Sequence, residues 1–323
     1  MTENNNKKIP LIVICGPTAS GKTRLSVELA KDLGGEVVCA DSMQVYKDMQ
    51  IITARVTEEE MQGIPHHLTG FLPLEQSFSV AEYCTLAREC IRDIHERGKL
   101  PIICGGTGLY ISSLLGNIVF EDSGADPERR AALEKYAEEH GRHALWLRLR
   151  ELDPEAAESI HENNLIRVVR AIEVCETTGG RFSEQRRKNL KGGAPYDALV
   201  MQIGFRDRQE LYDRINRRVG IMLEQGMVEE ARRVYESSDP ATAYQAIGYK
   251  ELIPYLEGRA DLDECAERIR QGTRHYAKRQ LTWFRRMDEI RTIYTSQTEE
   301  YKIFYENVQN TIAKSKILCY NIT

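Results

Sequence analysis

Residues 16–23 read GPTASGKT, and this octapeptide constrains the fold more than any other part of the chain. It fits the pattern G-x-x-x-x-G-K-[ST] and stands between an apolar run, 11–15, and an amphipathic stretch, 22–33, so it joins a predicted strand to a predicted helix. In that context the backbone N–H groups of the loop and of the first helical turn form a site for a di- or triphosphate. The alternative is a glycine-rich turn that binds nothing. The predicted phosphate-binding residues are Gly16, Pro17, Thr18, Ala19, Ser20, Gly21, Lys22 and Thr23.

Two side chains of this loop have specific expected roles. We expect Lys22 to lie along the terminal phosphate oxygens, and the Thr23 hydroxyl to reach a Mg²⁺ ion that bridges them. The pattern indicates a phosphate chain but does not identify the molecule that carries it.

The segments around the loop alternate between strand-like and helix-like patterns. Three short apolar runs, at 11–15, 36–40 and 100–104, have the composition of strands buried on both faces of a parallel sheet. Between them, 22–33 and 80–97 carry apolar residues at helical spacing and stop at glycines. This alternation predicts an α/β fold whose core is a parallel sheet like that of the P-loop nucleoside triphosphatases.

Changes in composition divide the chain into four parts. Residues 1–118 hold the loop and the first strands of the core. Residues 119–196 are strongly charged and mostly helical in pattern, so we expect a helical insertion there. The chain returns to the core over 197–290, with a strand at 201–205 and then helices, one of which is strongly basic. Residues 291–323 are expected to form a C-terminal tail.

Charge and cysteine content narrow the class of protein. The formal net charge is −5, from 44 Lys and Arg against 49 Asp and Glu, which excludes a uniformly basic nucleic-acid coat but allows a local basic face. No apolar run approaches the roughly 20 residues that span a bilayer. The polar residues 1–10 lack the layout of a secretory signal, and the eight cysteines never stand at Cys-x-x-Cys spacing. We therefore expect reduced thiols in a cytoplasmic protein.

Two polar residues follow predicted strands and should face the phosphate loop. Asp41 comes after 36–40, and Thr107 stands in GGTG after 100–104, where many P-loop enzymes instead carry a carboxylate that organises Mg²⁺. Ligands bind outside the carboxyl ends of parallel strands, so Asp41, Thr107 and the loop should line one crevice. Asp41 has two interpretations of equal weight, a proton acceptor beside a phosphate leaving group or a helix N-cap.

Two basic segments stand out, at 181–191 and 265–287. In the second, Arg270, Arg274 and Lys278 recur at helical spacing beside an apolar stripe. One sign of charge dominates that face, which favours contact with a phosphate backbone over an ordinary solvated surface.

Several other side chains each have two possible roles. Arg214 and Arg218 share one helical face and could reach leaving-group phosphates or pair with nearby acids. His66 and His67 are adjacent in an extended segment, where side chains point to opposite sides, so a structural role is favoured over a metal pair. Trp283 is expected in the core rather than stacked on a base.

Six motifs occur in order along the chain: GPTASGKT, ADSMQVYKDM, TEEEMQGIPHHL, GGTGLYI, AYQAIGYKEL and AKRQLTWFRR. Together they resemble the bacterial tRNA dimethylallyltransferases, also called tRNA isopentenyltransferases, over residues from about 9 to about 290. The resemblance implies transfer of a dimethylallyl group from dimethylallyl diphosphate to the exocyclic amine of the adenosine 3′-adjacent to the anticodon in tRNA, with release of diphosphate. We expect tRNA and the diphosphate donor as partners, Mg²⁺ as cofactor, no membrane, and a monomer.

The resemblance also implies roles for individual residues. The loop would hold a diphosphate that departs, which agrees with the absence of a carboxylate after 100–104. Asp41 is implied as the proton acceptor, Thr107 as a second residue of the catalytic site, and Arg214 and Arg218 are expected beside the diphosphate. The expected tRNA contacts are Asp41, Ser42, Met43, Gln44, Thr107, Arg130, Arg167, Arg170, Arg274 and Lys278.

Two other functions fit parts of the pattern. A small-molecule kinase fits the loop and the arginine-rich segment after residue 205, and it predicts phosphoryl transfer that is insensitive to RNA. A non-catalytic nucleic-acid-binding module fits the basic segments, and it predicts that Asp41→Ala leaves every activity intact.

Overall fold

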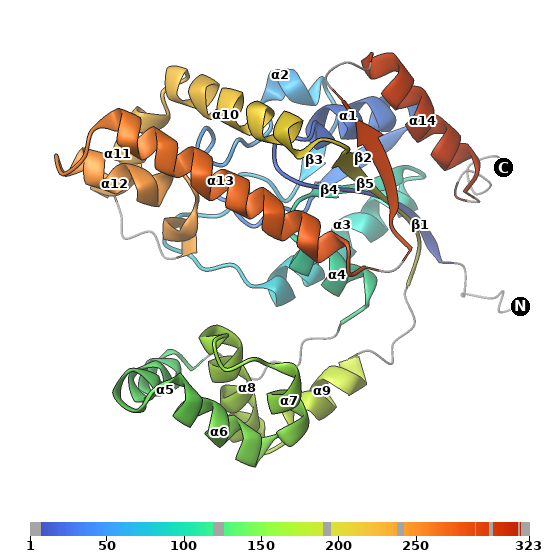
Figure 1. Ribbon diagram of the computed structural model, residues 1–323. Coiled ribbons are helices and arrows are strands. Elements are labelled where there is room, and N and C mark those ends of the chain that lie inside the picture. The colour runs from blue at the N-terminus through green and yellow to red at the C-terminus, as the bar shows by residue number, and fades with distance from the viewer. Residues whose placement is uncertain are drawn as a thin grey trace, which may run out of the picture. The chain divides into compact units, whose positions relative to one another are not determined.

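The computed structural model describes residues 8–118, 126–189, 195–237, 242–287, 289–296, 300–315 and 317 of the chain. They fall into two compact units, coloured along the chain in Figure 1. The core unit comprises 1–115 and 195–323, and the helical unit comprises 116–194. No helix among the described residues has both the length and the apolar character that a membrane-crossing segment requires.

The core unit is built on one sheet. Its strands are β1 (Ile9–Cys15), β2 (Gly35–Cys39), β3 (His66–His67), β4 (Leu100–Gly105), β5 (Tyr196–Phe205) and β6 (Arg291–Thr295). All neighbouring pairs run parallel in the order β3-β2-β4-β1-β5-β6, which puts β1 in the interior. The runs predicted as strands correspond to β1, β2, β4 and the second half of β5, so the predicted α/β fold is confirmed.

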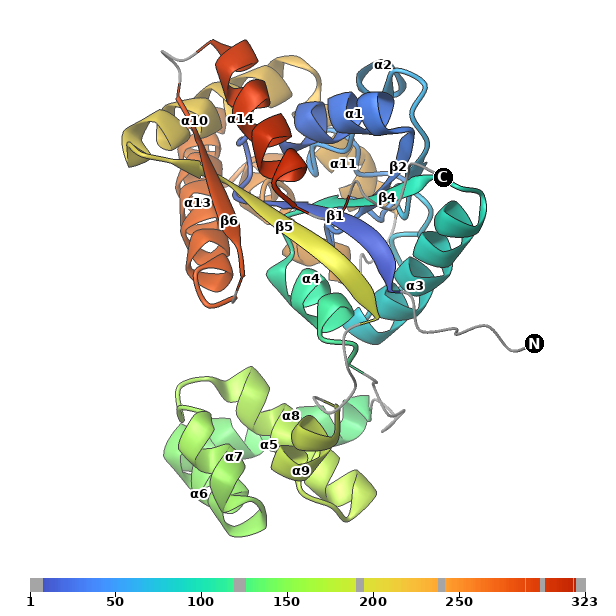
Figure 2. The same cartoon turned by 90° about the vertical axis from the view of Figure 1, so that its right-hand side faces the viewer.

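Helices of the core unit connect and cover these strands. They are α1 (Lys22–Leu33), α2 (Glu58–Met61), α3 (Val80–Glu96), α4 (Gly108–Leu115), α10 (Arg208–Glu224), α11 (Met227–Ser237), α12 (Tyr249–Leu256), α13 (Leu262–Phe284) and α14 (Tyr301–Ala313), with a 3₁₀ turn at Thr242–Gln245. Figure 2 shows α1 and α14 over one face of the sheet, and α3 with α4 over the other. Burial on both faces explains why the strands read as continuous apolar runs.

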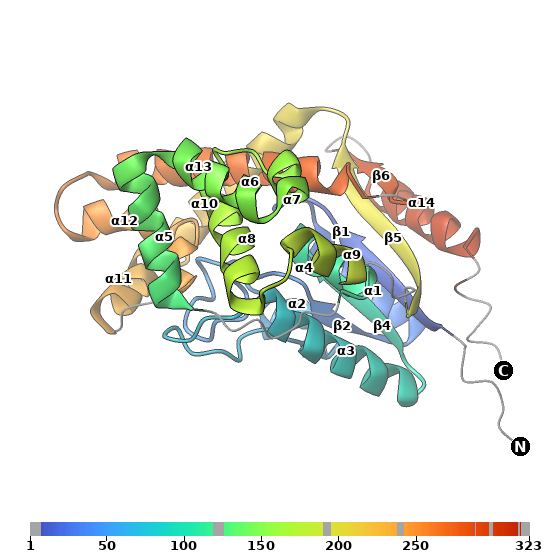
Figure 3. The same ribbon diagram turned by 90° about the horizontal axis from the view of Figure 1, so that it is seen from below.

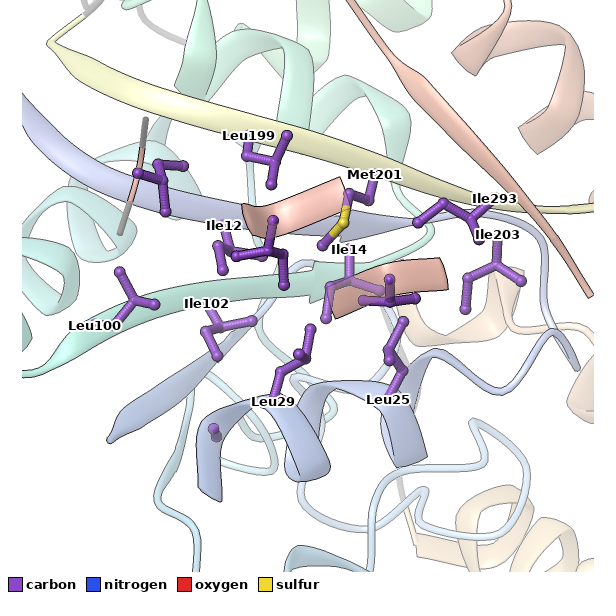
Figure 4. Packing of buried hydrophobic residues seen from close by; sticks show 14 of the residues in the cluster. Ile12, Ile14, Leu25, Leu29, Leu100, Ile102, Leu199, Met201, Ile203 and Ile293 are labelled. Carbon is purple, nitrogen blue, oxygen red and sulfur yellow. The ribbon is translucent and has the colours of Figure 1, made fainter. Parts of the chain in front are cut away.

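The main apolar core lies between the sheet and α1. Figure 4 shows Ile12 and Ile14 of β1 pointing toward Leu25 and Leu29 of α1, with Ile102 of β4 beside them. All five side chains are at most 1% exposed. This packing holds the end of β1 and the start of α1 in fixed positions, and the phosphate loop lies between them.

The C-terminal segment is part of this core, and the expectation of a tail over 291–323 is wrong for its described residues. β6 pairs with β5 along its length, and α14 buries Phe304, Val308 and Ile312 in the same cluster as β1. These three residues recur every four positions, which is the spacing of a helical face that packs against a core.

A second group of helices lies between β5 and β6 in the sequence. α10 and α13 pack side by side, with Leu211 and Ile215 against Ala277 (Figure 1). α11 and α12 enclose a further cluster with the segment 45–52, which includes buried Tyr46. This cluster places 45–52, which lies far away in sequence, next to the later helices.

The helical unit has its own core. Its helices are α5 (Pro127–His140), α6 (Arg142–Leu152), α7 (Pro154–Ser159), α8 (Leu165–Thr178) and α9 (Phe182–Asn189), seen from below in Figure 3. Leu133, Leu145, Leu149 and Ile172 are among the residues buried between them. A separate apolar core is the property that lets a unit keep its shape independently of the rest of a chain.

Candidate active site

The phosphate loop runs from the end of β1 to the start of α1. Gly21 precedes the helix with φ of 90°, a conformation that side-chain-bearing residues rarely adopt, and it has no side chain to cap α1. The N–H groups of the first turn are therefore left for an anionic ligand, which the positive end of the helix dipole also favours.

Lys22 lies within this loop. Its Nζ donates a hydrogen bond of 2.6 Å to the carbonyl oxygen of Pro17, which folds the side chain back over the loop. Burial lowers the pKa of Lys22, the nearby charge of Arg218 lowers it further, and the carboxylate of Asp41 acts in the opposite direction. A phosphate group would replace the weak carbonyl partner with a full negative charge.

Gln280 of α13 joins the phosphate loop to the end of β4. Its Oε1 accepts the backbone N–H of Thr18 at 2.9 Å, and its Nε2 donates to the carbonyl oxygen of Gly106 at 3.0 Å. The side chain is 4% exposed, so both bonds are shielded from water. The amide of Thr18 is thereby committed to holding the loop in place.

Asp41 follows β2 at the same edge of the sheet. No helix follows it, so the N-cap interpretation is wrong, and its Oδ1 instead accepts the N–H of Met43 at 3.0 Å within a turn. β4 approaches closely here, because a Cβ on Gly105 would lie 2.1 Å from the carbonyl oxygen of Ala40. The absence of a side chain at Gly105 lets the two strand ends meet.

Because the two strand ends lie close together, Thr107 contacts the residues on either side of Asp41. Its Oγ1 accepts the N–H of Ser42 at 3.0 Å, and its own N–H donates to Ala40. The hydroxyl of Tyr276 on α13 also belongs to this group. Burial raises the pKa of Tyr276, the charge of Asp41 adds to the rise, and hydrogen bonds to Thr107 and Gln280 oppose it. Tyr276 thus lies near Asp41, Thr107 and Gln280, the residue that holds the phosphate loop.

The phosphate loop, Asp41 and Gln280 line a cavity of about 1020 Å³ in the core unit, and Thr107 and Tyr276 are not among its lining residues. Residues 18–23 of the phosphate loop line it together with Asp41 and Gln44. One long wall is a face of α10 that changes in character along the helix, from Arg214, Arg217 and Arg218 to Ile221 and Met222. The opposite wall contains Gln50, Ile51, Thr53, Ala54, Arg55 and Thr57, and we call residues 50–57 the wall loop.

The two arginines predicted beside the phosphates both line this cavity. Arg218 contacts the phosphate loop through Thr18 Oγ1 at 3.5 Å and the wall loop through the carbonyl of Ala54 at 3.4 Å. Arg214 stacks on the ring of Phe205, 5.2 Å from its centre. Among the described residues neither guanidinium has a carboxylate within ion-pair distance, so both charges are available to an anion in the cavity.

The segment after Asp41 uses its side chains within the protein. Gln44 donates through Nε2 to the carbonyls of Thr53 and Ala54, at 3.4 and 3.2 Å, and it lines the cavity. Met43 packs against the cluster formed by α11 and α12. These contacts fix the segment that follows Asp41 beside the cavity.

In the helical unit, Arg130 and Arg170 bind the same carboxylate. Glu173 is fully buried and accepts from Arg130 Nε at 2.9 Å and from Arg170 Nη1 at 2.6 Å. These bonds oppose the desolvation of Glu173, and its pKa is lowered. Arg167 lies on the exposed side of α8 beside Ile166, which is 79% exposed. Arg130 and Arg170 are thus bound to the middle of α8, whereas Arg167 is exposed to solvent.

The basic face predicted on α13 is divided between two roles. Arg274 bonds to Asn216 Oδ1 of α10 and to Glu267 Oε1, both at 2.8 Å, so it joins α13 to α10. Lys278 is exposed, as is Arg279. In the other basic segment, Lys191 and the side chains at 186 and 188 lie outside the described part of the chain.

The two histidines serve the structure. His67 Nε2 bonds to Glu36 at 2.8 Å, and His66 Nδ1 bonds to the carbonyl of Ile64. No group of three or more His, Cys, Asp or Glu side chains suited to a metal exists within the described ranges. A divalent cation at this site would therefore depend on oxygens of a bound phosphate, with the hydroxyl of Thr23 in the cavity lining as a further ligand.

An interior strand that ends in a phosphate loop, inside an all-parallel sheet, defines this chain as a P-loop α/β protein. The family described as IPP transferase matches residues 44–287, and the one described as isopentenyl transferase matches 9–69. The chain belongs to the IPP transferase family, the family of the tRNA dimethylallyltransferases, which confirms the resemblance carried by the six motifs.

Individual relatives are similar over almost their whole length. The tRNA dimethylallyltransferase of Caldanaerobacter subterraneus subsp. tengcongensis is 46% identical over 94% of this chain and 98% of its own. That of Bacillus cytotoxicus is 50% identical over 90% of this chain and 91% of its own.

Solved structures of members of this family are also similar to this chain. A tRNA isopentenylpyrophosphate transferase from Bacillus halodurans superposes with a TM-score of 0.71 at 40% identity, covering 97% of this chain and all of that one. A eukaryotic dimethylallyltransferase acting on tRNA gives a TM-score of 0.82 at 32% identity, covering 97% of this chain and 80% of that one.

Some residues of the site were not singled out as functional from the sequence, although Gln280 stands within the motif AKRQLTWFRR. Gln280 and Tyr276 stand in or beside a predicted basic helix, where the charges attract attention instead. The apolar end of the α10 wall, at Ile221 and Met222, continues the helical face of Arg214 and Arg218, so extending that face by one turn would have found it.

Proposed function

We propose that this chain transfers a dimethylallyl group from dimethylallyl diphosphate to the exocyclic amine of the adenosine 3′-adjacent to the anticodon in tRNA, and releases diphosphate. One observation carries the proposal: a single cavity contains both a phosphate loop with arginines and a carboxylate, Asp41, suited to accept a proton. Membership of the tRNA dimethylallyltransferase family supports the same reaction.

The α10 wall matches the donor in polarity. An allylic diphosphate has a highly charged head and a hydrocarbon tail, and α10 offers Arg214, Arg217 and Arg218 at one end and Ile221 with Met222 further along. The head binds at the loop and the arginines, which stabilise the charge that builds up on the leaving oxygens. The tail lies against the apolar residues, whose burial excludes water.

Asp41 acts on the acceptor. Its carboxylate accepts a hydrogen bond from the adenine amine and takes the proton as the nitrogen–carbon bond forms and the carbon–oxygen bond to diphosphate breaks. Thr107 holds the Asp41–Ser42 turn in place through its bond to Ser42. The amine of a stacked base does not reach a cavity, so the adenine must leave the stack of the anticodon loop, which typically costs a few kcal/mol.

Mg²⁺ fits this site as a cofactor held mainly by the diphosphate, with Thr23 as its protein ligand. When bound it neutralises part of the charge on the leaving group. The residues of the chain perform the remaining steps of binding, orientation and proton transfer.

We also propose that residues of both units contact the tRNA. In the core unit, Ser42, Met43 and Gln44 form the segment next to Asp41, and Lys278 with Arg274 supplies a basic surface on α13. In the helical unit, Arg130, Arg167 and Arg170 bind the anticodon stem-loop. As part of the same proposal, the enzyme works as a monomer in the cytoplasm, where its tRNA substrate is found.

The transfer assay tests the proposal directly. Purified protein with Mg²⁺, labelled dimethylallyl diphosphate and a tRNA with adenosine 3′ to the anticodon should label the RNA, whereas a tRNA with another base at that position should stay unlabelled. Transfer of label from ATP to a small acceptor, with no label on RNA, would instead show a kinase.

A further inference from the structure

We propose that Glu230, on α11 outside the cavity, is a positioning residue for the donor site. It holds the wall loop in the conformation that orients Arg218. The inference rests on the proposed function, because it concerns binding of the same diphosphate donor.

Glu230 binds three successive backbone amides. Its Oε2 accepts from the N–H groups of Gln50 and Ile51, at 3.0 and 2.9 Å, and its Oε1 accepts from Ile52 at 2.8 Å. The residue is 3% exposed. A carboxylate in such a place is stable only when its oxygens are hydrogen-bonded, and here the wall loop supplies the donors.

The position of Glu230 on its helix favours the negative charge. It lies in the first turn of α11, where backbone N–H groups point outward and the helix dipole is positive. A glutamine here would keep only one acceptor oxygen and would point an NH₂ donor at a backbone N–H. The carboxylate is therefore the functional group that fits.

The residues that Glu230 binds, 50–52, belong to the part of the wall loop that lines the cavity. Gln50, Ile51, Thr53 and Ala54 all line it, and Ala54 has a φ of 50°, which a residue with a side chain adopts only when its surroundings impose it. Because the backbone at Ala54 is strained, the wall loop keeps this conformation only if other contacts stabilise it. Glu230 supplies such contacts through its hydrogen bonds to residues 50–52.

The wall loop in turn positions Arg218, the phosphate-binding arginine. The carbonyl of Ala54 accepts from Arg218, and Arg218 contacts Thr18 of the phosphate loop. Burial lowers the pKa of Arg218, so its side chain depends on correctly placed acceptors. Glu230 thus acts on the donor through the wall loop and Arg218, without touching the donor.

The test compares Glu230→Gln with Glu229→Gln, which changes the same group on the neighbouring exposed residue. At a temperature where both variants are folded by circular dichroism, we expect the KM for dimethylallyl diphosphate to rise about tenfold in Glu230→Gln only. The KM for tRNA should rise less, because Glu230 affects the segment after Asp41 only through the bonds that Gln44 donates to Thr53 and Ala54. Glu230→Asp keeps the charge but is one methylene shorter, and it should show the same selective rise to a smaller extent.

A double-mutant cycle with Arg218→Ala separates positioning from general stability. If Glu230 acts through Arg218, the increases in donor KM from Glu230→Gln and Arg218→Ala combine to less than their product. An unchanged donor KM in a folded Glu230→Gln protein, or effects that multiply fully, would overturn the inference. Failure of the wild-type protein to label tRNA would instead overturn the proposed function.

Discussion

At the scale of single residues, the site combines side chains from local motifs with side chains that act through contacts with distant parts of the chain. Lys22 and Asp41 belong to recognisable stretches, and both line the same cavity. Gln280 stands in one of the six motifs, but neither its role nor that of Glu230 could be found in that way, because these roles come from contacts with residues 262 and about 180 positions away. A buried amide or carboxylate has no sequence pattern of its own when its partners are backbone groups.

Asp41→Asn should separate turnover from binding. The substitution keeps the shape and the acceptor for Met43, but it removes the basic carboxylate, so we expect kcat to fall by about a hundredfold or more. Affinity for tRNA, measured by filter binding, should remain close to that of the wild type. Equal loss of both would show that Asp41 is structural.

At the scale of helices and strands, buried parallel strands and the helix after the phosphate loop were predictable, since long apolar or periodic runs carry strong patterns. β6 was not, because it exposes three of its five residues and so lacks an apolar run. α14 was missed although Phe304, Val308 and Ile312 stand at helical spacing. Interactions between elements could not be predicted either. An example is the set of ion pairs that Glu36, near the start of β2, forms with Arg97, Lys99 and His67.

Glu36 should make stability depend on pH. Its hydrogen bonds to Arg97, opposed by burial and aided by Lys99 and His67, hold its pKa well below the ordinary value of 4.5. The stabilisation is therefore full above about pH 4.5 and is lost as the pH falls below that value. Glu36→Gln should lower the free energy of unfolding by about 2 kcal/mol at neutral pH. In urea titrations this difference should shrink by about 1 kcal/mol near pH 3.5, and a constant difference would contradict the assignment.

Phe304→Ala tests whether α14 is part of the core. Phe304 is 3% exposed in the cluster with β1, so its truncation should cost about 3–4 kcal/mol of unfolding free energy. Ile303→Ala, at an exposed neighbouring position, is the matched control and should cost far less. Similar small effects from both changes would mean that α14 contributes little to stability.

At the scale of the whole molecule, the chain forms a core unit and a helical unit. The change in composition near residue 119 indicated the boundary, because charged helical segments differ from buried strands. The donor cavity lies wholly within the core unit, so chemistry and part of the RNA recognition can be altered separately.

Arg167→Glu should weaken tRNA binding without affecting the donor. The exposed arginine of α8 is expected to contact an RNA phosphate, so the charge reversal should reduce the slope of log Kd against log salt concentration by about one. The KM for dimethylallyl diphosphate should not change. Lys302→Glu, the same type of charge reversal on α14, serves as the control, and an equal effect there would point to a non-specific charge effect.

The strand order has a consequence for synthesis of the protein. β1 is made first, yet its partner β5 leaves the ribosome only after the entire helical unit has been translated. Until then the nascent chain exposes an unpaired apolar edge, the kind of surface that invites aggregation. We expect ribosome-bound chains that stop near residue 190 to recruit chaperones, and chains long enough for β5 to emerge fully to release them.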